Sequence, residues 1–276
     1  MIRLVVNADD LGLHPRIDAG ILRAHREGIV TSATVLATGS SAREAIAAAR
    51  SQGLALGVHL CLTTRLPPAA PASEVKSLVP DGRFRAGWSD VVAAWISRRI
   101  RLEDVDREFR AQIDRARQLG AEPDHLDGHQ HLHLLPGISR IVVAIAREQR
   151  LPIRWPIAAP GESWLAHPGS ALKTTLIAAL SFATRRNGAS GLSGLGTFEA
   201  GMLNEERLLA LLSRLGDGDY EVGCHPGEDV DQVPEEPDWR YRWTEELEAL
   251  CSHSVRALVE GRRIALTTYR GIYRGS

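Results

Sequence analysis

Cysteine is scarce in this chain of 276 residues, and several common signals are absent from it. Its three cysteines, Cys61, Cys224 and Cys251, are an odd number without the spacing of a disulfide framework, which favours a reducing, cytoplasmic location. No apolar run approaches the roughly 18 residues of a transmembrane helix, and the N-terminus predicts no signal peptide. Lys plus Arg number 33 and Asp plus Glu 34, so nothing in the charge balance points to nucleic acid.

Apolar segments of strand length alternate with segments of helical periodicity along the sequence. Predicted strands cover 4–8, 29–37, 54–62, 124–129, 153–156, 220–225 and 263–268. One predicted helix begins at about Pro15, and the others cover 41–51, 89–100, 103–119, 138–149, 171–184, 205–215 and 243–259. With no repeat or low-complexity linker, this alternation predicts one α/β domain over residues 1–276, with about seven parallel strands in an open sheet or a barrel.

Two regions depart from the short connections expected of such a fold. Residues 63–87 are rich in proline and turn residues, and their length predicts a functional lid. A loop is expected over 187–196, and the helix over 171–184 either packs against the core or lies on a membrane surface. Ordinary packing is the favoured alternative for that helix, and peripheral membrane contact stays open.

Histidine is concentrated in the stretch His125–His133, which holds four of the ten histidines and Asp127, all at odd positions. An extended strand would place these five side chains on one face and mostly leucine on the other. A buried row of imidazoles and a carboxylate is costly unless something such as a divalent metal pairs with it. The alternative is a polar loop with scattered histidines. A helical zinc-protease motif is excluded, because no glutamate follows His129 and Pro136 closes the segment.

Three further candidates stand at the ends of predicted strands: Asp9-Asp10, His59 and His225. In parallel α/β folds, sites form at the carboxyl ends of the strands, so the fold would bring these residues to the histidine stretch. Neighbouring aspartates point in opposite directions in a regular strand, so one could bind a metal while the other acts as a base. Each candidate has an ordinary alternative: a helix cap for the aspartates, a core histidine at 59 and a turn residue at 225.

Five motifs occur in order along the chain: Asn7–Leu13, Gly28–Thr34, Gly57–Leu60, His125–His133 and Gly223–Pro226. Together they resemble the YdjC-like carbohydrate deacetylases, a family that includes chitooligosaccharide deacetylases and hopanoid-biosynthesis-associated deacetylases. The resemblance runs from residue 2 to about Arg270. One departure is Leu11, where the family usually has phenylalanine, and we expect it to alter packing and not chemistry.

The resemblance implies a distorted (β/α) barrel related to polysaccharide deacetylases. It implies removal of the N-acetyl group from an N-acetylglucosamine-type unit, in an oligosaccharide or a glycolipid. It also implies the residue roles: Asp10, His59 and His129 as metal ligands, Asp9 as general base, His225 as general acid and Asp127 as the group that orients a histidine. Two imidazoles and one carboxylate favour one Zn2+ ion over Mg2+ on ligand softness. Arg154 and Arg270, at other strand ends, either bind substrate hydroxyls or stabilise the fold.

Two rival functions stay open. A metallo-phosphoesterase would need a two-metal site, for which Asp127, His131 and His133 could supply further ligands. Otherwise His131 is a candidate to support the site or contact substrate. A sugar- or metal-binding barrel without catalysis is the non-enzymatic rival, and Asp9 beside a candidate ligand argues against it, because a binder needs no base. The sequence does not indicate an oligomeric state.

Overall fold

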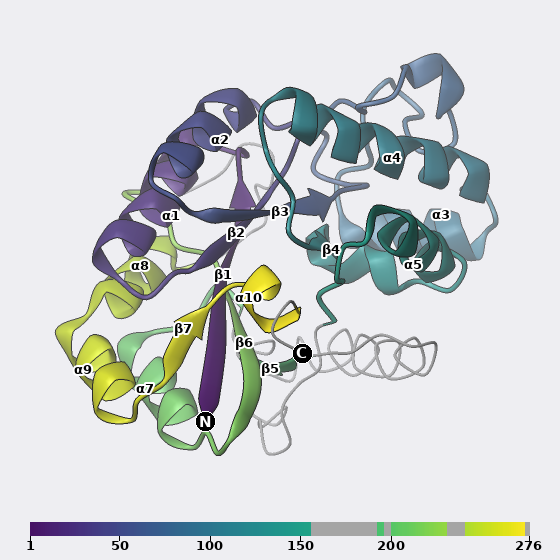
Figure 1. Cartoon of the computed structure of the whole chain (residues 1–276). Helices are drawn as coiled ribbons and strands as arrows, with labels where there is room; N and C mark the ends of the chain where they lie inside the picture. Colours follow the sequence, from purple (N-terminus) through teal and green to yellow (C-terminus); the bar gives the residue numbers. More distant parts are fainter. Residues whose placement is uncertain (156–191, 196–199, 231–240, 274–276) are drawn as a thin grey trace.

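The computed structural model describes residues 1–155, 192–195, 200–230 and 241–273, which form an α/β fold around one parallel sheet (Figure 1). The strands are β1 (Ile2–Leu11), β2 (Ser32–Val35), β3 (Ala55–Leu60), β4 (Leu126–Gly128), β5 (Ser193–Leu195), β6 (Gly218–Cys224) and β7 (Ala265–Thr267). Their order is β4-β3-β2-β1-β6-β5, and every pairing is parallel. The long first strand has three partners: β6 runs along one edge, while β7 and β2 share the other.

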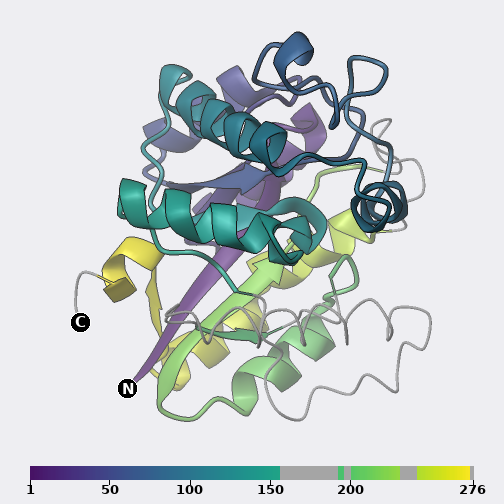
Figure 2. The ribbon, with the colours of Figure 1, turned by 90° about the vertical axis from the view of Figure 1, so that its right-hand side faces the viewer.

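Helices pack around the sheet (Figure 2). They are α1 (Pro15–Glu27), α2 (Ala42–Ser51), α3 (Trp88–Ile96), α4 (Leu102–Gln118), α5 (Ile138–Gln149), α7 (Glu205–Ser213), α8 (Trp243–Cys251), α9 (His253–Gly261) and α10 (Tyr269–Tyr273), with 3-10 turns η1 (Ala72–Glu74) and η2 (His129–Leu134). In the described part of the chain, no helix is long and apolar enough to cross a membrane. Alternation along β1 directs Leu4, Val6 and Ala8 into the main core, and Asn7 and Asp9 to the opposite, inner face. Polar side chains therefore collect on the inner face.

The predicted α/β fold with about seven parallel strands is confirmed. Two segments differ from their predictions, one expected to be a loop and one expected to be a strand. Residues 193–195 were expected in a loop, but they form β5 because they pair with β6 at the edge of the sheet. The expected strand over 153–156 is reduced, where it is described, to a single bridge between Leu126 and Ile153. Pairing with a neighbouring strand decides both cases, and a single segment does not reveal its pairing.

The predicted helix over 243–259 is wrong in a different way, because the structure has two helices there. The backbone at Ser252 is extended, and its side chain accepts a hydrogen bond from the Val255 N–H at 3.1 Å, which caps α9. A serine inside an otherwise helical pattern therefore ends one helix and begins the next. The predicted helix over 171–184, with its membrane alternative, lies outside the described residues.

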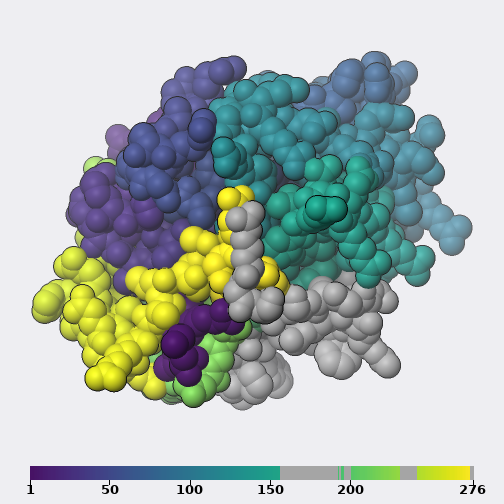
Figure 3. Space-filling view, viewed as in Figure 1, coloured from purple at the N-terminus to yellow at the C-terminus, as the bar shows by residue number. Residues whose placement is uncertain are grey.

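The proline-rich loop over 63–87 is anchored to the body of the protein. Its buried apolar side chains are Leu66, Ala70, Val75, Leu78, Val79 and Phe84. On α4, the Glu108 carboxylate accepts hydrogen bonds from the N–H groups of Ala69 and Ala70 at 2.8 and 3.0 Å. The loop and α3 make up the blue corner at the upper right of Figure 3. Closure of this loop over a substrate remains a prediction.

A buried carboxylate, Asp18, ties the end of β1 to the start of α2. One of its oxygens accepts a hydrogen bond from the Gly12 N–H at 2.6 Å, and the other accepts one from the Ser41 hydroxyl. Burial raises the pKa of Asp18 to about 6, although both hydrogen bonds act to lower it. The folded protein therefore binds a proton more readily than the unfolded chain between about pH 4 and pH 6. The contribution of Asp18 to the free energy of unfolding is therefore fully present below about pH 4 and is lost as the pH rises through 6.

We expect an Asp18→Asn variant to gain stability relative to the wild type as the pH rises from 4 to 7. The relative gain should reach about 3 kcal/mol, because asparagine carries no charge to bury. Urea unfolding at several pH values measures it. Asp114→Asn on the exposed face of α4 serves as control and should run parallel to the wild type. If the free energy of unfolding of Asp18→Asn also ran parallel to that of the wild type across this pH range, the raised pKa of Asp18 would be contradicted.

Candidate active site

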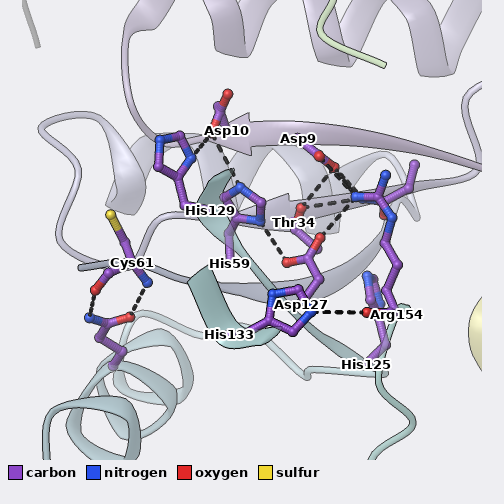
Figure 4. Close-up of polar contacts among 12 residues, drawn as sticks. Asp9, Asp10, Thr34, His59, Cys61, His125, Asp127, His129, His133 and Arg154 are labelled. Atoms are coloured by element: carbon purple, nitrogen blue, oxygen red, sulfur yellow. Dashed lines mark hydrogen bonds and ion pairs between the residues drawn. The ribbon is translucent and has the colours of Figure 1, made fainter. Parts of the chain in front are cut away.

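Three side chains from distant segments converge at the carboxyl ends of β1, β3 and β4 (Figure 4). Asp10 lies near the end of β1, His59 near the end of β3, and His129 begins η2 directly after β4. The Asp10 Oδ1 atom lies 2.9 Å from His129 Nδ1 and 3.4 Å from His59 Nε2. All three side chains are buried, and one potential ligand atom from each lies within 4.8 Å of the others. The residues predicted as metal ligands therefore share one site.

The turn at Asp10 explains how two neighbouring aspartates reach the same site. Asp9 follows the strand alternation onto the inner face, whereas the backbone of Asp10 is left-handed, with φ of 72°. The register of β1 with β2 also shifts between Ala8 and Leu11. A left-handed aspartate costs about 1 kcal/mol, and such strain is typical of functional sites. The irregular end of β1 thus directs both carboxylates to one place.

The hydrogen bonding of His59 provides a test of whether this site suits a cation. Its Nδ1 donates to Asp127 Oδ1 at 2.6 Å, so in the neutral ring the Nε2 lone pair faces Asp10 Oδ1. Two acceptors facing each other repel unless a proton or a metal ion lies between them. Asp10 Oδ2 is buried and accepts no hydrogen bond from the described residues, and the nearest nitrogen to Oδ1 is His129 Nδ1 at 2.9 Å. A histidine that ligates a metal usually donates its other ring N–H to a carboxylate, as His59 does to Asp127, so the residues fit a divalent ion.

The pKa of His59 agrees with this preference for positive charge. Burial alone would lower it, but the neighbouring carboxylates, Asp127 above all, raise it. A second potential ligand set, Asp9 with His59 and Asp127, shares His59 with the first. Because the His59–Asp127 hydrogen bond occupies that set, the set that contains Asp10 is the better candidate to hold an ion.

Asp9 is held apart from the metal set by partners of its own. Arg154 Nη1 donates to both of its oxygens, at 2.7 and 2.8 Å. Asn7 Nδ2 donates to Oδ1 at 2.7 Å, and the Thr34 hydroxyl does so at 3.3 Å. Burial acts to raise the pKa of Asp9, but the nearby positive charges, that of Arg154 first, hold it well below its usual range. Asp9 is therefore a fixed, ionised carboxylate.

His225, directly after β6, borders the same carboxylate from the other side. Its Nε2 lies 3.8 Å from Asp9 Oδ2. On its own side, the His225 backbone N–H donates to Glu246 Oε2 at 2.6 Å, and its ring meets that of Tyr241 edge-on at 4.8 Å between centroids. The Glu246 carboxylate is buried in α8, which fixes the end of β6 against that helix. Asp9 and His225 thus form a pair beside the Asp10 cluster.

Arg154 is the centre of a buried ionic network. Its guanidinium donates to Asp9 as above, to Asp127 Oδ2 at 3.0 Å and to Glu221 Oε1 at 3.3 Å. The Tyr269 hydroxyl donates to the other oxygen of Glu221 at 2.7 Å. With only 7% of the residue exposed, Arg154 stands among carboxylates inside the sheet. Of the two predicted roles, this placement favours stabilising the fold over binding substrate.

The site and its surroundings contain residues to which the sequence interpretation gave no role: Asn7, Thr34, Glu221, Glu246 and Tyr269. One signal was available for Glu221, because it has the same parity as His225 within the predicted strand over 220–225 and so lies on the same face. The close approach of Arg154 to this strand needs a glycine, since a Cβ on Gly223 would lie 2.0 Å from the guanidinium. Tyr269 reaches the network from α10, and the only signal for it was its place in the stretch 268–271, which also fits the family resemblance.

Comparison with known proteins identifies the family. A family model described as YdjC-like protein matches residues 3–261. The chain belongs to the YdjC-like family. A carbohydrate deacetylase of Geobacillus stearothermophilus is 31% identical over 273 residues, and a chitooligosaccharide deacetylase of Klebsiella pneumoniae (strain 342) is 33% identical over 275 residues. Each alignment covers 98% of both chains.

One solved structure is similar along the full length of this YdjC-like chain. It belongs to a protein of Enterococcus faecalis V583 that was proposed to cleave cellobiose phosphate. The two chains are 30% identical, the TM-score is 0.77, and the match covers 98% of each. The two chains therefore share one arrangement of strands and helices.

The predicted single-faced row of histidines in this YdjC-like chain is wrong. The strand ends at Gly128, and η2 follows, with left-handed backbone at Gln130 and His131. His133 is consequently turned away, its Nε2 lying 3.3 Å from the Arg154 carbonyl oxygen, and burial lowers its pKa to about 4. His131 is partly exposed, and its ring centroid lies 6.1 Å from that of His133. Only His129 of the later histidines joins the Asp10 cluster.

His125 and Arg270 lie away from the Asp10 cluster, towards the amino ends of the strands. His125 is buried below the site, where it stacks on Tyr269 at 3.8 Å and hydrogen bonds to Asp124 at 2.6 Å. The Arg270 backbone N–H also donates to Asp124, at 3.4 Å, next to the start of β4. Arg270 therefore lies at the amino ends of β3 and β4, opposite the end that carries His59 and His129. This placement favours a role in the fold over contact with substrate.

Proposed function

We propose that this YdjC-like chain is a metal-dependent hydrolase that removes the N-acetyl group from an N-acetylglucosamine-type sugar. The observation that carries the proposal is the buried cluster of Asp10, His59 and His129 next to a separately held carboxylate, Asp9. The relatives described as carbohydrate and chitooligosaccharide deacetylases support the substrate class. An oligosaccharide and a glycolipid are both acceptable forms of the sugar.

The ligand set and the local charge both suit a divalent ion. Three buried carboxylates meet in this region, those of Asp9, Asp10 and Asp127. Among the described residues, the guanidinium that contacts them is that of Arg154. A divalent cation offsets the remaining negative charge. Two imidazoles with one carboxylate favour Zn2+ over Mg2+. When bound, such an ion polarises a carbonyl group, lowers the pKa of water and stabilises the oxyanion that forms on attack.

The protein's own residues then divide the proton transfers. Asp9, fixed by Arg154 and Asn7, accepts a proton from the attacking water while the water oxygen bonds to the acetamide carbon. His225, on the opposite side of Asp9, acts as the general acid and donates a proton to the amide nitrogen as the C–N bond breaks. Acetate and a free amino sugar result. The metallo-phosphoesterase alternative is less well supported, because His131 and His133 do not join the metal set.

Metal analysis combined with an acetate assay tests the proposal. Wild-type protein should contain one ion per chain and release acetate from N-acetylglucosamine oligomers, from an N-acetylglucosaminyl lipid, or from both. His129→Ala should lose the ion, and acetate release should fall by about 1000-fold or more. His253→Ala, an exposed histidine at the start of α9, is the matched control and should change neither value.

Three outcomes of that assay would count against parts of the proposal. A His129→Ala protein that retains both metal and rate would refute the ligand assignment. Wild-type protein that binds metal yet releases no acetate from either substrate would refute deacetylation, and phosphate esters would then be assayed. Wild-type protein without metal after purification free of chelators would refute the metal site itself.

A further inference from the structure

Four arginines line one cavity between the 63–87 loop and α3, outside the residues of the catalytic proposal. The cavity has a volume of about 660 Å3, and its charged lining is Arg65, Arg83, Arg85, Arg99, Asp81 and Asp90. Four guanidinium groups against two carboxylates leave an excess of two positive charges. The whole chain, in contrast, has a formal net charge of −1. The positive charge is therefore concentrated here.

The backbone of the loop brings two arginine-bearing segments together. The Thr64 N–H donates to the Ala86 carbonyl (3.3 Å), and the Phe84 N–H donates to the Leu66 carbonyl (3.0 Å). Thr64 and Arg65 have left-handed backbone, with φ of 71° and 51°, so these segments form a turn-like contact and not a regular strand pair. The two hydrogen bonds hold Arg65 and Arg85 in the lining of the same cavity.

The guanidinium groups keep hydrogen-bonding capacity for a ligand. The guanidinium groups of Arg65 and Arg99 make no hydrogen bond or ion pair with any residue that the structure describes. Arg83 uses Nη1 on the Arg65 carbonyl at 3.0 Å, and Arg85 uses Nη1 on two loop carbonyls at 2.9 and 3.1 Å. Burial lowers the pKa of Arg85, and the charge of Arg99 lowers it further, whereas Asp90 opposes this. The arginine charges are thus only partly compensated by the protein.

We propose that this cavity binds a phosphoryl group. A phosphoryl dianion matches the excess of two positive charges, and its oxygens suit the planar forks of several guanidinium groups. The group has two possible sources, a soluble phosphate ester or the headgroup of a lipid. Ile96, with 68% of its surface exposed, precedes Ser97 of the cavity lining, and a lipid source would bring an acyl chain near it. The proposal concerns binding alone and does not depend on the deacetylase function.

Titration calorimetry of the full chain tests the soluble source, with inorganic phosphate and glucose 6-phosphate as probes. Co-sedimentation with phosphatidylcholine vesicles, with and without phosphatidic acid, tests the lipid source. The Arg65→Gln/Arg99→Gln double variant should bind the successful probe about tenfold or more weakly. Arg43→Gln/Arg140→Gln removes the same charge from exposed positions on α2 and α5 and should bind like the wild type.

Each outcome decides the matter. Saturable binding of either soluble probe, lost in the Arg65/Arg99 variant alone, supports a soluble phosphate ester. Sedimentation that requires phosphatidic acid and the same two arginines supports the headgroup. Absence of binding in both assays overturns the proposal. Equal weakening in the Arg43/Arg140 control also overturns it, because the effect would then be one of net charge.

Discussion

An Asp9→Asn variant is expected to keep its metal ion and to lose about 100- to 10,000-fold in kcat. Asparagine has the same shape but cannot accept the proton of the attacking water. The Asp10 cluster does not include Asp9, so metal content should stay at the wild-type value. KM should change little, because the loss concerns proton transfer. Metal analysis and steady-state acetate release on one preparation measure both quantities.

Asp10→Asn is the matched control for this prediction, since it makes the same chemical change one residue further along the chain. It should lose the ion together with the activity, because an amide is a far weaker ligand than a carboxylate. The contrast between the two variants is the informative result. Loss of metal from Asp9→Asn, with retention in Asp10→Asn, would reverse the roles assigned to the two aspartates.

Arg154→Met is expected to destabilise the protein by about 3–5 kcal/mol, because it leaves buried carboxylates without their cation. The structure shows Asp9, Asp127 and Glu221 all within hydrogen-bond distance of this guanidinium. Urea unfolding of wild type and variant measures the loss. Arg140→Met, at an exposed position of α5, should stay within about 0.5 kcal/mol of the wild type.

The same experiment distinguishes the two roles that the sequence left open for Arg154. If Arg154→Met unfolds at the wild-type urea concentration but shows a raised KM, the arginine binds substrate and the fold does not need it. An unstable variant whose fold is partly restored in Arg154→Lys would support the structural role, since lysine keeps the charge but lacks the planar fork.

Patterns within single segments predicted much of this molecule. Alternation of strands with helices predicted the parallel sheet, and the family resemblance is confirmed. The rule that sites form at the carboxyl ends of parallel strands brought Asp10, His59 and His129 together, as the structure does. Their roles as ligands, and those of Asp9 and His225 in proton transfer, stay predictions until the variants are measured.

Features that depend on backbone turns and on long-range pairing were beyond the sequence. Regular strand geometry predicted that Asp9 and Asp10 point apart, but left-handed backbone at Asp10 directs both to one site. The same effect at Gln130 and His131 breaks the expected histidine row. A single residue in a left-handed conformation reverses the direction of its side chain, and neighbouring contacts decide whether the chain accepts that cost.

By itself, the sequence determined the fold class, the family and the types of residue available for chemistry, because these follow from local periodicity and from motifs. Only the tertiary structure decided the partners of each charged group. Arg154 lies 145 positions from Asp9 and 67 from Glu221, yet it binds both, whereas Arg270 was carried to the opposite end of the strands. Strand register and the packing of connecting segments set those distances, and the free energy of a buried ion pair depends on them far more than on spacing along the chain.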